Sequence, residues 1–346
     1  MPSAPNLSHS TAAFATFGML PPLAFLIVAI LLILTLSLVI LFLLIGTEYK
    51  NSDLTSIFDI YVLFLKFVLH NCSICIMNIS VFIGKKELDP EISDLIETLI
   101  SGGCKVEVLS EGKLPCSDAD MLLSVGGDGT FLSSSRLAAV NDIPVMGVNF
   151  GRMGFLSENR SASVVQALLS GEYSIENRVM LKADVVTGNP EIDEWPFALN
   201  EFTVHRNGAA MLGVDVTIDG VDLPTYWSDG LIVSTSSGST AYSLSAGGPI
   251  VLPESRVLIV TPIAPHNLNV RPLVVPDTSV ITLKMHSRDG SVIFTADNRT
   301  ALIPSEQEVV INVAQFSLKR VRLKRSNFIE ALTEKLYWGE DVRNIK

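Results

Sequence analysis

The sequence has few cysteines and few basic residues, and it has no internal repeat. Its four cysteines (Cys72, Cys75, Cys104 and Cys116) are irregularly spaced and too few for a disulfide framework. Cys72 and Cys75 form a C-x-x-C pair, but no second pair and no histidine cluster accompanies it. The pair therefore does not indicate a metal or redox site, and we expect a reducing compartment, the cytoplasm, for the main part of the chain.

Acidic residues outnumber basic residues in this sequence. There are 25 lysines and arginines against 36 aspartates and glutamates, which gives a net charge of −11. Non-specific binding of nucleic acid requires a basic face, so we expect no nucleic-acid partner. One local basic run stands near the C-terminus, and the acidic total favours a solvated strand face for it: Lys319, Arg320, Arg322, Lys324 and Arg325.

The first 76 residues differ from the rest because they contain long apolar runs. Residues 23–45 are apolar except for two hydroxyl side chains, which is long enough to span a bilayer as a helix. No basic residue precedes this run and no small-residue cleavage pattern follows it, which excludes a typical signal peptide. A second run, 57–69, is interrupted by two charges. Two interpretations stay open for 1–76: a membrane anchor, or sequence upstream of a true start at Met77, which we favour.

From Met77 the pattern alternates between strands and helices. Strands are expected at 79–83, 105–109, 121–125 and 144–148, with helical spacing between the first two. This predicts an α/β domain over 77–174 whose parallel sheet binds ligands at the carboxyl ends of its strands. After residue 175, short alternating strands separated by Gly, Pro, Asp and Asn predict an all-β, sandwich-like domain over 175–315. A last strand at 316–323 and a helix at 328–337 close the chain.

A glycine turn follows the third expected strand. Gly126, Gly127 and Gly129 let the backbone turn tightly with its N–H groups pointing outward, and a helix is expected to start at Phe131. A strand, a glycine turn and a helix N-terminus together make a phosphate site. Asp128 in the middle of this turn would repel phosphate unless it met a metal or took up a proton, which suggests phosphoryl transfer. The alternative is an ordinary glycine turn that contains an aspartate.

Two segments of the β-rich half carry further polar residues. Asn200 and Glu201 interrupt a strand-like run, where buried polar groups are costly unless they meet a partner. An amide beside a carboxylate suits sugar hydroxyls and the edge of a base. Residues 228–249 run from a strand into a hydroxyl-rich turn, which could seat a polar ligand while Tyr242 packs on a flat ring. The alternatives are a polar strand end and a flexible Ser/Thr loop.

Together these segments resemble the NAD kinase family. The matching elements are Gly-Gly-Asp-Gly-Thr at 126–130, Gly-Arg-Met-Gly-Phe-Leu at 151–156, Asn200-Glu201, Asp229-Gly230 and Gly-Ser-Thr-Ala-Tyr-Ser at 238–243. The first motif alone also resembles diacylglycerol, sphingosine and phosphofructo-kinases, but the combination is specific. The resemblance covers the chain from Met77 to its C-terminus and not residues 1–76.

The resemblance implies transfer of the terminal phosphoryl of ATP, or polyphosphate in some members, to the 2′-hydroxyl of the adenosine ribose of NAD. It implies that Asp128 is the general base, because a ribose hydroxyl is a poor nucleophile until its proton is taken. A divalent metal, Mg²⁺, is expected to accompany ATP, and no protein ligand for it is assigned. The phosphate loop is implied to consist of Gly126, Gly127, Gly129 and Thr130. No Gly-x-x-x-x-Gly-Lys-Ser/Thr loop is present, so no lysine of that type cradles ATP.

The resemblance also implies an NAD site in which Asn200 and Glu201 hold the adenosine portion and Asp229 and Ala241 contact the nicotinamide carboxamide. The implied set of NAD-binding residues is Asp128, Gly129, Asn200, Glu201, Asp229, Thr240, Ala241, Tyr242, Ser243, Leu244, Ser245 and, by a looser match, Arg299. Family members are usually homodimers or homotetramers whose sites are often completed across subunits. In the implied fold, the strand and helix of 316–346 return from the β-rich domain to the α/β kinase domain.

Two other functions remain as alternatives. A lipid kinase of the diacylglycerol or sphingosine type is favoured by the hydrophobic N-terminus, but Asn200-Glu201 and Thr240-Ala241-Tyr242 argue against it. A membrane-tethered sensor that binds a dinucleotide without catalysis is disfavoured by Asp128.

Overall fold

The computed structural model describes residues 77–84, 90–109, 115, 118–150, 154–157, 159, 161–324 and 327–336. These residues belong to one compact unit that begins at Met77. The apolar runs at 23–45 and 57–69 and the C-x-x-C pair lie outside the described residues. Within the described ranges, no helix is long and apolar enough to cross a membrane.

The first part of the unit is an α/β fold, as predicted. Its parallel strands follow the order β2-β1-β3-β4. Every residue of β3 and β4 is buried, and strands buried on both faces read in the sequence as continuous apolar runs. The elements are β1 (Asn78–Ile83), α3 (Pro90–Ser101), β2 (Lys105–Leu109), β3 (Met121–Val125), α4 (Asp128–Val140), β4 (Val145–Val148) and α5 (Ser161–Ser170). Helix α5 was not expected from the sequence.

The second part is a sandwich of antiparallel strands, also as predicted. One layer has six strands in the order β13-β12-β11-β7-β15-β16, and its core includes the stacked rings of Phe202 and Phe294 with centroids 5.5 Å apart. These six strands are β7 (Glu201–Arg206), β11 (Gly230–Thr235), β12 (Val257–Ile263), β13 (Leu273–Pro276), β15 (Ser291–Ala296) and β16 (Arg299–Pro304). The other layer contains β8 (Leu212–Ile218), β9 (Val221–Asp222), β10 (Tyr226–Ser228) and β14 (Ile281–His286).

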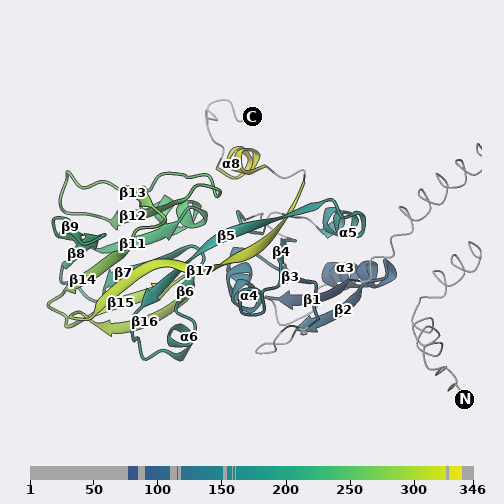
Figure 1. The fold of residues 1–346 in the computed structure, drawn as a ribbon, viewed down its shortest axis with the longest axis horizontal. Helices are drawn as coiled ribbons and strands as arrows, with labels where there is room; N and C mark the ends of the chain where they lie inside the picture. The colour runs from purple at the N-terminus through teal and green to yellow at the C-terminus, as the bar shows by residue number, and fades with distance from the viewer. Residues whose placement is uncertain are drawn as a thin grey trace, which may run out of the picture. The chain divides into compact units, whose positions relative to one another are not determined.

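Two long strands join the parts. β5 (Tyr173–Asp184) and β17 (Glu308–Leu323) pair antiparallel along most of their length and run between the two groups of elements in Figure 1. β17 also pairs with β4 and with β14, so a single sheet of 11 strands passes through both parts. The sequence predicts two strands at 308–313 and 316–323, whereas the structure forms one strand with an irregularity between Val313 and Ser317. The remaining elements are α6 (Pro190–Asp193), β6 (Phe197–Ala198), η2 (Ser237–Thr240), α7 (Tyr242–Ser245) and α8 (Phe328–Leu336).

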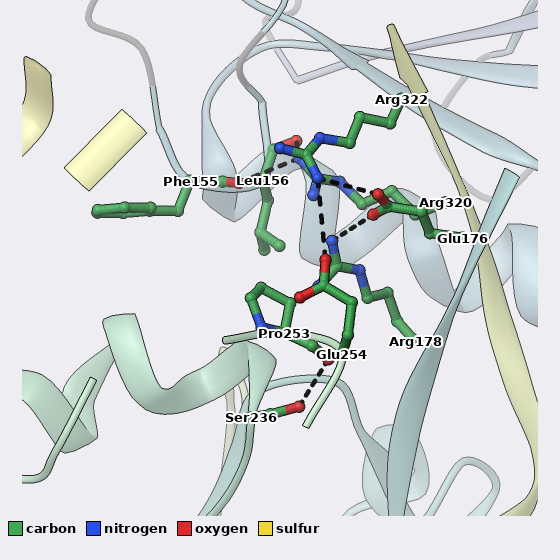
Figure 2. A network of polar contacts seen from close by, with 9 residues as sticks. All are labelled: Phe155, Leu156, Glu176, Arg178, Ser236, Pro253, Glu254, Arg320 and Arg322. Carbon is green, nitrogen blue, oxygen red and sulfur yellow. Dashed lines mark hydrogen bonds and ion pairs between the residues drawn. The ribbon is translucent and has the colours of Figure 1, made fainter. Parts of the chain in front are cut away.

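Two arginines of the basic run are buried on β17. Arg320 and Arg322 are only 4% and 9% exposed. Glu176 of β5 accepts hydrogen bonds from Arg322, at 3.0 Å, and from Arg178 (Figure 2). The prediction of a solvated strand face is therefore wrong for these two arginines, because the neighbouring strand supplies a carboxylate that offsets the cost of burying charge.

Candidate functional site

The glycine turn leads directly into α4. The helix begins at Asp128 with Gly127 as its N-cap, three residues earlier than predicted, so Asp128 lies in the first turn. A carboxylate there interacts favourably with the helix dipole. Gly126 has φ +150, and a Cβ added to it would lie 2.4 Å from Thr130 Oγ1, so only glycine fits. A Cβ added to Gly127 or Gly129 would meet nothing within 4 Å, which leaves open space where a phosphate could approach the backbone.

The Asp128 carboxylate lies against residues 154–157, the segment that follows β4. Its Oδ2 accepts the N–H of Phe155 at 2.9 Å, and its Oδ1 accepts those of Leu156 and Ser157 at 3.1 and 2.9 Å. A Cβ added to Gly154 would lie 1.9 Å from Oδ1, so this packing requires glycine. An ionised carboxylate offers about four lone-pair sites. Three of these sites accept hydrogen bonds in Asp128, and the remaining site is on Oδ2.

Asn200 and Glu201 form the second cluster. Both are buried, 6% and 8% exposed, and Asn200 Oδ1 and Glu201 Oε2 have no hydrogen-bond partner within the described part of the chain. The N–H groups of Leu199, Asn200 and Glu201 donate to the Asp297 carboxylate at 2.8, 2.8 and 3.2 Å. The polar pair is thus held by its backbone while Asn200 Oδ1 and Glu201 Oε2 stay available to a ligand.

Burial shifts the pKa of both Glu201 and Asp297 upward. Burial first, and then the nearby Asp297, raise the pKa of Glu201 to about 8, and the N–H of Tyr242 opposes the shift. Burial raises the pKa of Asp297 as well, but three N–H groups and Arg299 favour its ionised form. With a pKa of about 8, the Glu201 carboxyl is largely protonated at neutral pH, so that it can donate as well as accept. Sequence reasoning missed Asp297, which adopts φ 52 in the turn between β15 and β16.

The hydroxyl-rich turn packs directly on Asn200. A Cβ added to Gly238 would lie 2.2 Å from the Asn200 carbonyl oxygen. Within this turn, Tyr242 is 40% exposed, so its ring is open to a ligand. Ser243 is buried, and its Oγ lies 2.9 Å from Thr261 Oγ1. Ser245 is exposed.

One turn connects the two clusters. Asn298, next to Asp297, donates from Nδ2 to Ser133 Oγ of α4 at 3.2 Å. Ser133 Oγ in turn donates to the carbonyl of Gly129 at 3.3 Å. The 297–298 turn therefore holds the Asn200-Glu201 backbone on one side and the start of α4 on the other, which brings Asp128 and Glu201 to the same region.

Asp229 and Arg299 are placed elsewhere. Ser234 of β11 pairs with Glu201, whereas Gly230, next to Asp229, pairs with His205, so Asp229 lies five residues, about 17 Å, along the strands from Glu201. There it forms an ion pair with Arg206 at 2.8 Å. Arg299 donates to the carbonyls of Glu191 and Trp195, at 2.9 and 2.6 Å, and to that of Phe197.

Family models match both parts of the chain. The ATP-NAD kinase N-terminal domain matches residues 112–173, and the ATP-NAD kinase C-terminal domain matches residues 199–323. The NAD kinase of Flavobacterium psychrophilum is 42% identical over 229 residues, which cover 65% of this chain and 78% of that protein. The NAD kinase of Cytophaga hutchinsonii is 40% identical with the same coverage. The chain belongs to the NAD kinase family.

Solved structures agree with this assignment. An NAD kinase from Archaeoglobus fulgidus in complex with ATP is 28% identical, covers 75% of this chain and 99% of its own, and superposes with a TM-score of 0.62. Yeast NADH kinase complexed with NADH is 24% identical, covers 79% of this chain and 91% of its own, and has a TM-score of 0.65, which supports the shared fold. The predicted family and fold are confirmed, and the lipid kinase is not favoured.

Proposed function

We propose that this NAD kinase transfers the terminal phosphoryl of ATP to the 2′-hydroxyl of the adenosine ribose of NAD, giving NADP. The proposal rests on one observation: the 297–298 turn connects two clusters of polar groups. The first is Asp128 beside the open glycine turn. The second is the pair of unpartnered oxygens, Asn200 Oδ1 and Glu201 Oε2. The first cluster suits a phosphoryl donor and a base. The second suits a nucleoside.

Asp128 Oδ2 is the atom that takes the ribose proton in this proposal. It accepts one N–H, whereas Oδ1 accepts two, so the free lone pair of the carboxylate is on Oδ2. The segment 154–157 fixes the carboxylate, and a fixed base needs little reorganisation when the 2′-oxygen attacks phosphorus. The exposed N–H groups at Gly127 and Gly129 would face the phosphate oxygens.

Asn200 and protonated Glu201 would recognise the adenosine portion of NAD. Together they present donors and acceptors in a buried place, where a missing hydrogen bond is costly, so they discriminate against acceptors without matching groups. The exposed ring of Tyr242 would pack on a flat ring of the dinucleotide.

Magnesium would enter with ATP. In the described ranges, no group of three or more His, Cys, Asp or Glu side chains is placed to hold a metal ion. Asp128 is the carboxylate nearest to the open turn, so the phosphate oxygens themselves would supply most of the ligands. When bound, the metal would neutralise charge on the transferred phosphoryl.

A second copy of the chain would complete the site. In one chain, Asp229 lies at the far end of the β7–β11 pair from Glu201 and is engaged in an ion pair with Arg206. We therefore propose a homodimer or homotetramer in which Asp229 of one subunit contacts the nicotinamide end of NAD held mainly by another. Arg299 is engaged with three carbonyls, so we assign it to holding residues 191–197 and not to NAD.

The test is to incubate the purified full-length chain, in detergent if required, with ATP, Mg²⁺ and NAD and to measure NADP⁺. Parallel reactions with diacylglycerol or sphingosine in place of NAD test the lipid kinase, and polyphosphate in place of ATP tests the donor. NAD binding without turnover would support the sensor and contradict the proposal. Fractionation of cells would test the cytoplasmic location.

A further inference from the structure

The three peptide groups that hold Asp128 are each bonded at their other end by a cation. The N–H of Phe155 belongs to the peptide whose carbonyl is that of Gly154, and this carbonyl accepts a hydrogen bond from Lys335 Nζ. The next two carbonyls, of Phe155 and Leu156, accept from Arg320 Nη2 at 3.1 and 3.2 Å (Figure 2). Every N–H that reaches the Asp128 carboxylate is thus part of a peptide group whose oxygen faces Lys335 or Arg320.

Such an arrangement couples the cations to the carboxylate. A donor on a carbonyl polarises the peptide group and strengthens its N–H as a donor, and bonds to charged partners are the stronger ones. Rotating any one of these peptides would break its bonds at both ends. The segment is therefore fixed in the orientation that holds Asp128 only while the cations are in place.

Lys335 is brought to this segment by α8, the last helix, 181 residues from Gly154 in the chain. Its Nζ lies 4.6 Å from the centroid of the Phe155 ring, and that ring contacts Phe328, the first residue of α8, with centroids 6.1 Å apart. A backbone contact, a cation–π contact and a ring contact thus fix the helix on residues 154–155.

Arg320 is held from the opposite side, on β17. Its side chain is buried beside Arg178 and Glu176 of β5. The charges of these three side chains interact with one another. Arg320 cannot turn to water from this place, so its guanidinium remains directed at the two carbonyls.

We propose that Lys335 and Arg320 are positioning residues for phosphoryl transfer and act on the Asp128 carboxylate through the three peptide groups of residues 154–157. The proposal rests on the proposed role of Asp128 as the base. Both cations donate to backbone carbonyls of residues 154–156, so their loss changes the placement of the base more than the binding of the acceptor.

The first test is Lys335→Met in the full-length chain. Because small misplacements of a catalytic group are costly, kcat falls about 10- to 100-fold while KM for NAD changes less than about twofold. Lys335→Arg restores most of kcat, since arginine also donates to a carbonyl and stacks on a ring. The matched control is Lys319→Met, on β17, which removes a lysine bonded to Asp142 and leaves kcat unchanged.

The second test separates a positioning role from a merely structural one. In an Asp128→Asn background, Lys335→Met causes little further loss, because its effect passes through Asp128. Equal fold losses in both backgrounds, or a wild-type kcat in Lys335→Met, would overturn the proposal. The same comparison in both backgrounds is made for the second cation with Arg320→Lys and Arg320→Met. The melting temperature of each variant is measured as well.

A third readout needs no activity. Hydrogen exchange at the N–H of Phe155 is faster in Lys335→Met than in wild type, and unchanged exchange contradicts the proposal. If the wild-type chain makes no NADP⁺, the proposed function fails, and this exchange measurement still decides whether Lys335 holds the segment.

Discussion

Two hydrogen bonds join Asp297 to the main chain of Glu201. The N–H of Glu201 donates to the Asp297 carboxylate at 3.2 Å, and the N–H of Asp297 donates to the carbonyl of Glu201 at 3.0 Å. These bonds hold two carboxyl side chains in one buried corner, where burial raises the pKa of both. The proton therefore stays on Glu201 at neutral pH, with its pKa raised to about 8.

The first prediction concerns stability and pH in Glu201→Gln. A carboxyl whose folded pKa is raised from 4.5 to about 8 contributes stability that is fully present below pH 4.5 and lost as the pH rises through 8. Between pH 5 and pH 9, the unfolding free energy of wild type should fall by on the order of 3 kcal/mol more than that of Glu201→Gln. Urea unfolding of both proteins at the two pH values measures this. Parallel losses would mean that Glu201 is ionised in the fold.

The second prediction concerns Asp128→Asn. The amide cannot take the ribose proton, so kcat should fall roughly 10²-fold or more while NAD still binds. One oxygen becomes an NH₂ group and would face an N–H of residues 155–157, so melting temperature must be compared as well. Asp142→Asn is the control, since Asp142 has φ 54, which asparagine tolerates, and lies at the other end of α4. Near-normal kcat in Asp128→Asn would remove Asp128 as the base.

The third prediction concerns Tyr242. Replacing its exposed ring by alanine should weaken NAD binding by about 1–3 kcal/mol, because ring contact with the dinucleotide is lost. Tyr242→Phe keeps the ring and should bind NAD nearly as wild type does. Calorimetric titration with NAD distinguishes the two variants. An unchanged affinity in the alanine variant places Tyr242 outside the site.

The fourth prediction tests the second copy. Asp128→Asn and Asp229→Asn chains should each have low activity alone. When the two chains are co-expressed, mixed oligomers form in which some sites contain neither substitution. Activity per site should then rise toward about one quarter of wild type for a dimer assembled at random with one site completed by each partner. A mixture no more active than its separate components argues that each chain makes its own site.

The strands of the α/β part were predictable because local pattern determines them. β1, β2 and β3 begin and end within one residue of expectation. β3 is buried along its whole length, and such strands are short apolar runs that end at polar residues or glycine. Short strands such as β13 and β16 were missed. β13 has only Val275 buried, so its sequence carries little pattern.

The residues around the site were less predictable because they are far apart in the chain. Asp128, Asn200 and Tyr242 lie in motifs, whereas Asp297 contacts residues 96–98 positions away and Lys335 reaches Gly154 across 181. Nothing local distinguishes such an aspartate or lysine from a surface charge. Arg320 shows the same limit in reverse, since its local pattern indicated a solvated face and the partner strand buries it.

The last prediction concerns deletion of residues 1–76. The compact unit begins at Met77, and each residue assigned to the site lies after it. β1 is an inner strand between β2 and β3, and its start is already fixed by this unit: the carbonyl of Met77 accepts the N–H of Lys105 at 2.9 Å, and the N–H of Asn78 donates to Asp120 at 2.8 Å. Both contacts survive in a chain that starts at Met77. Residues 77–346 should therefore fold with the kcat and NAD affinity of the full-length protein, as measured by melting temperature and NADP⁺ formation. If the shortened chain aggregates, or loses activity that the full-length chain retains in detergent, residues 1–76 contribute to the enzyme itself.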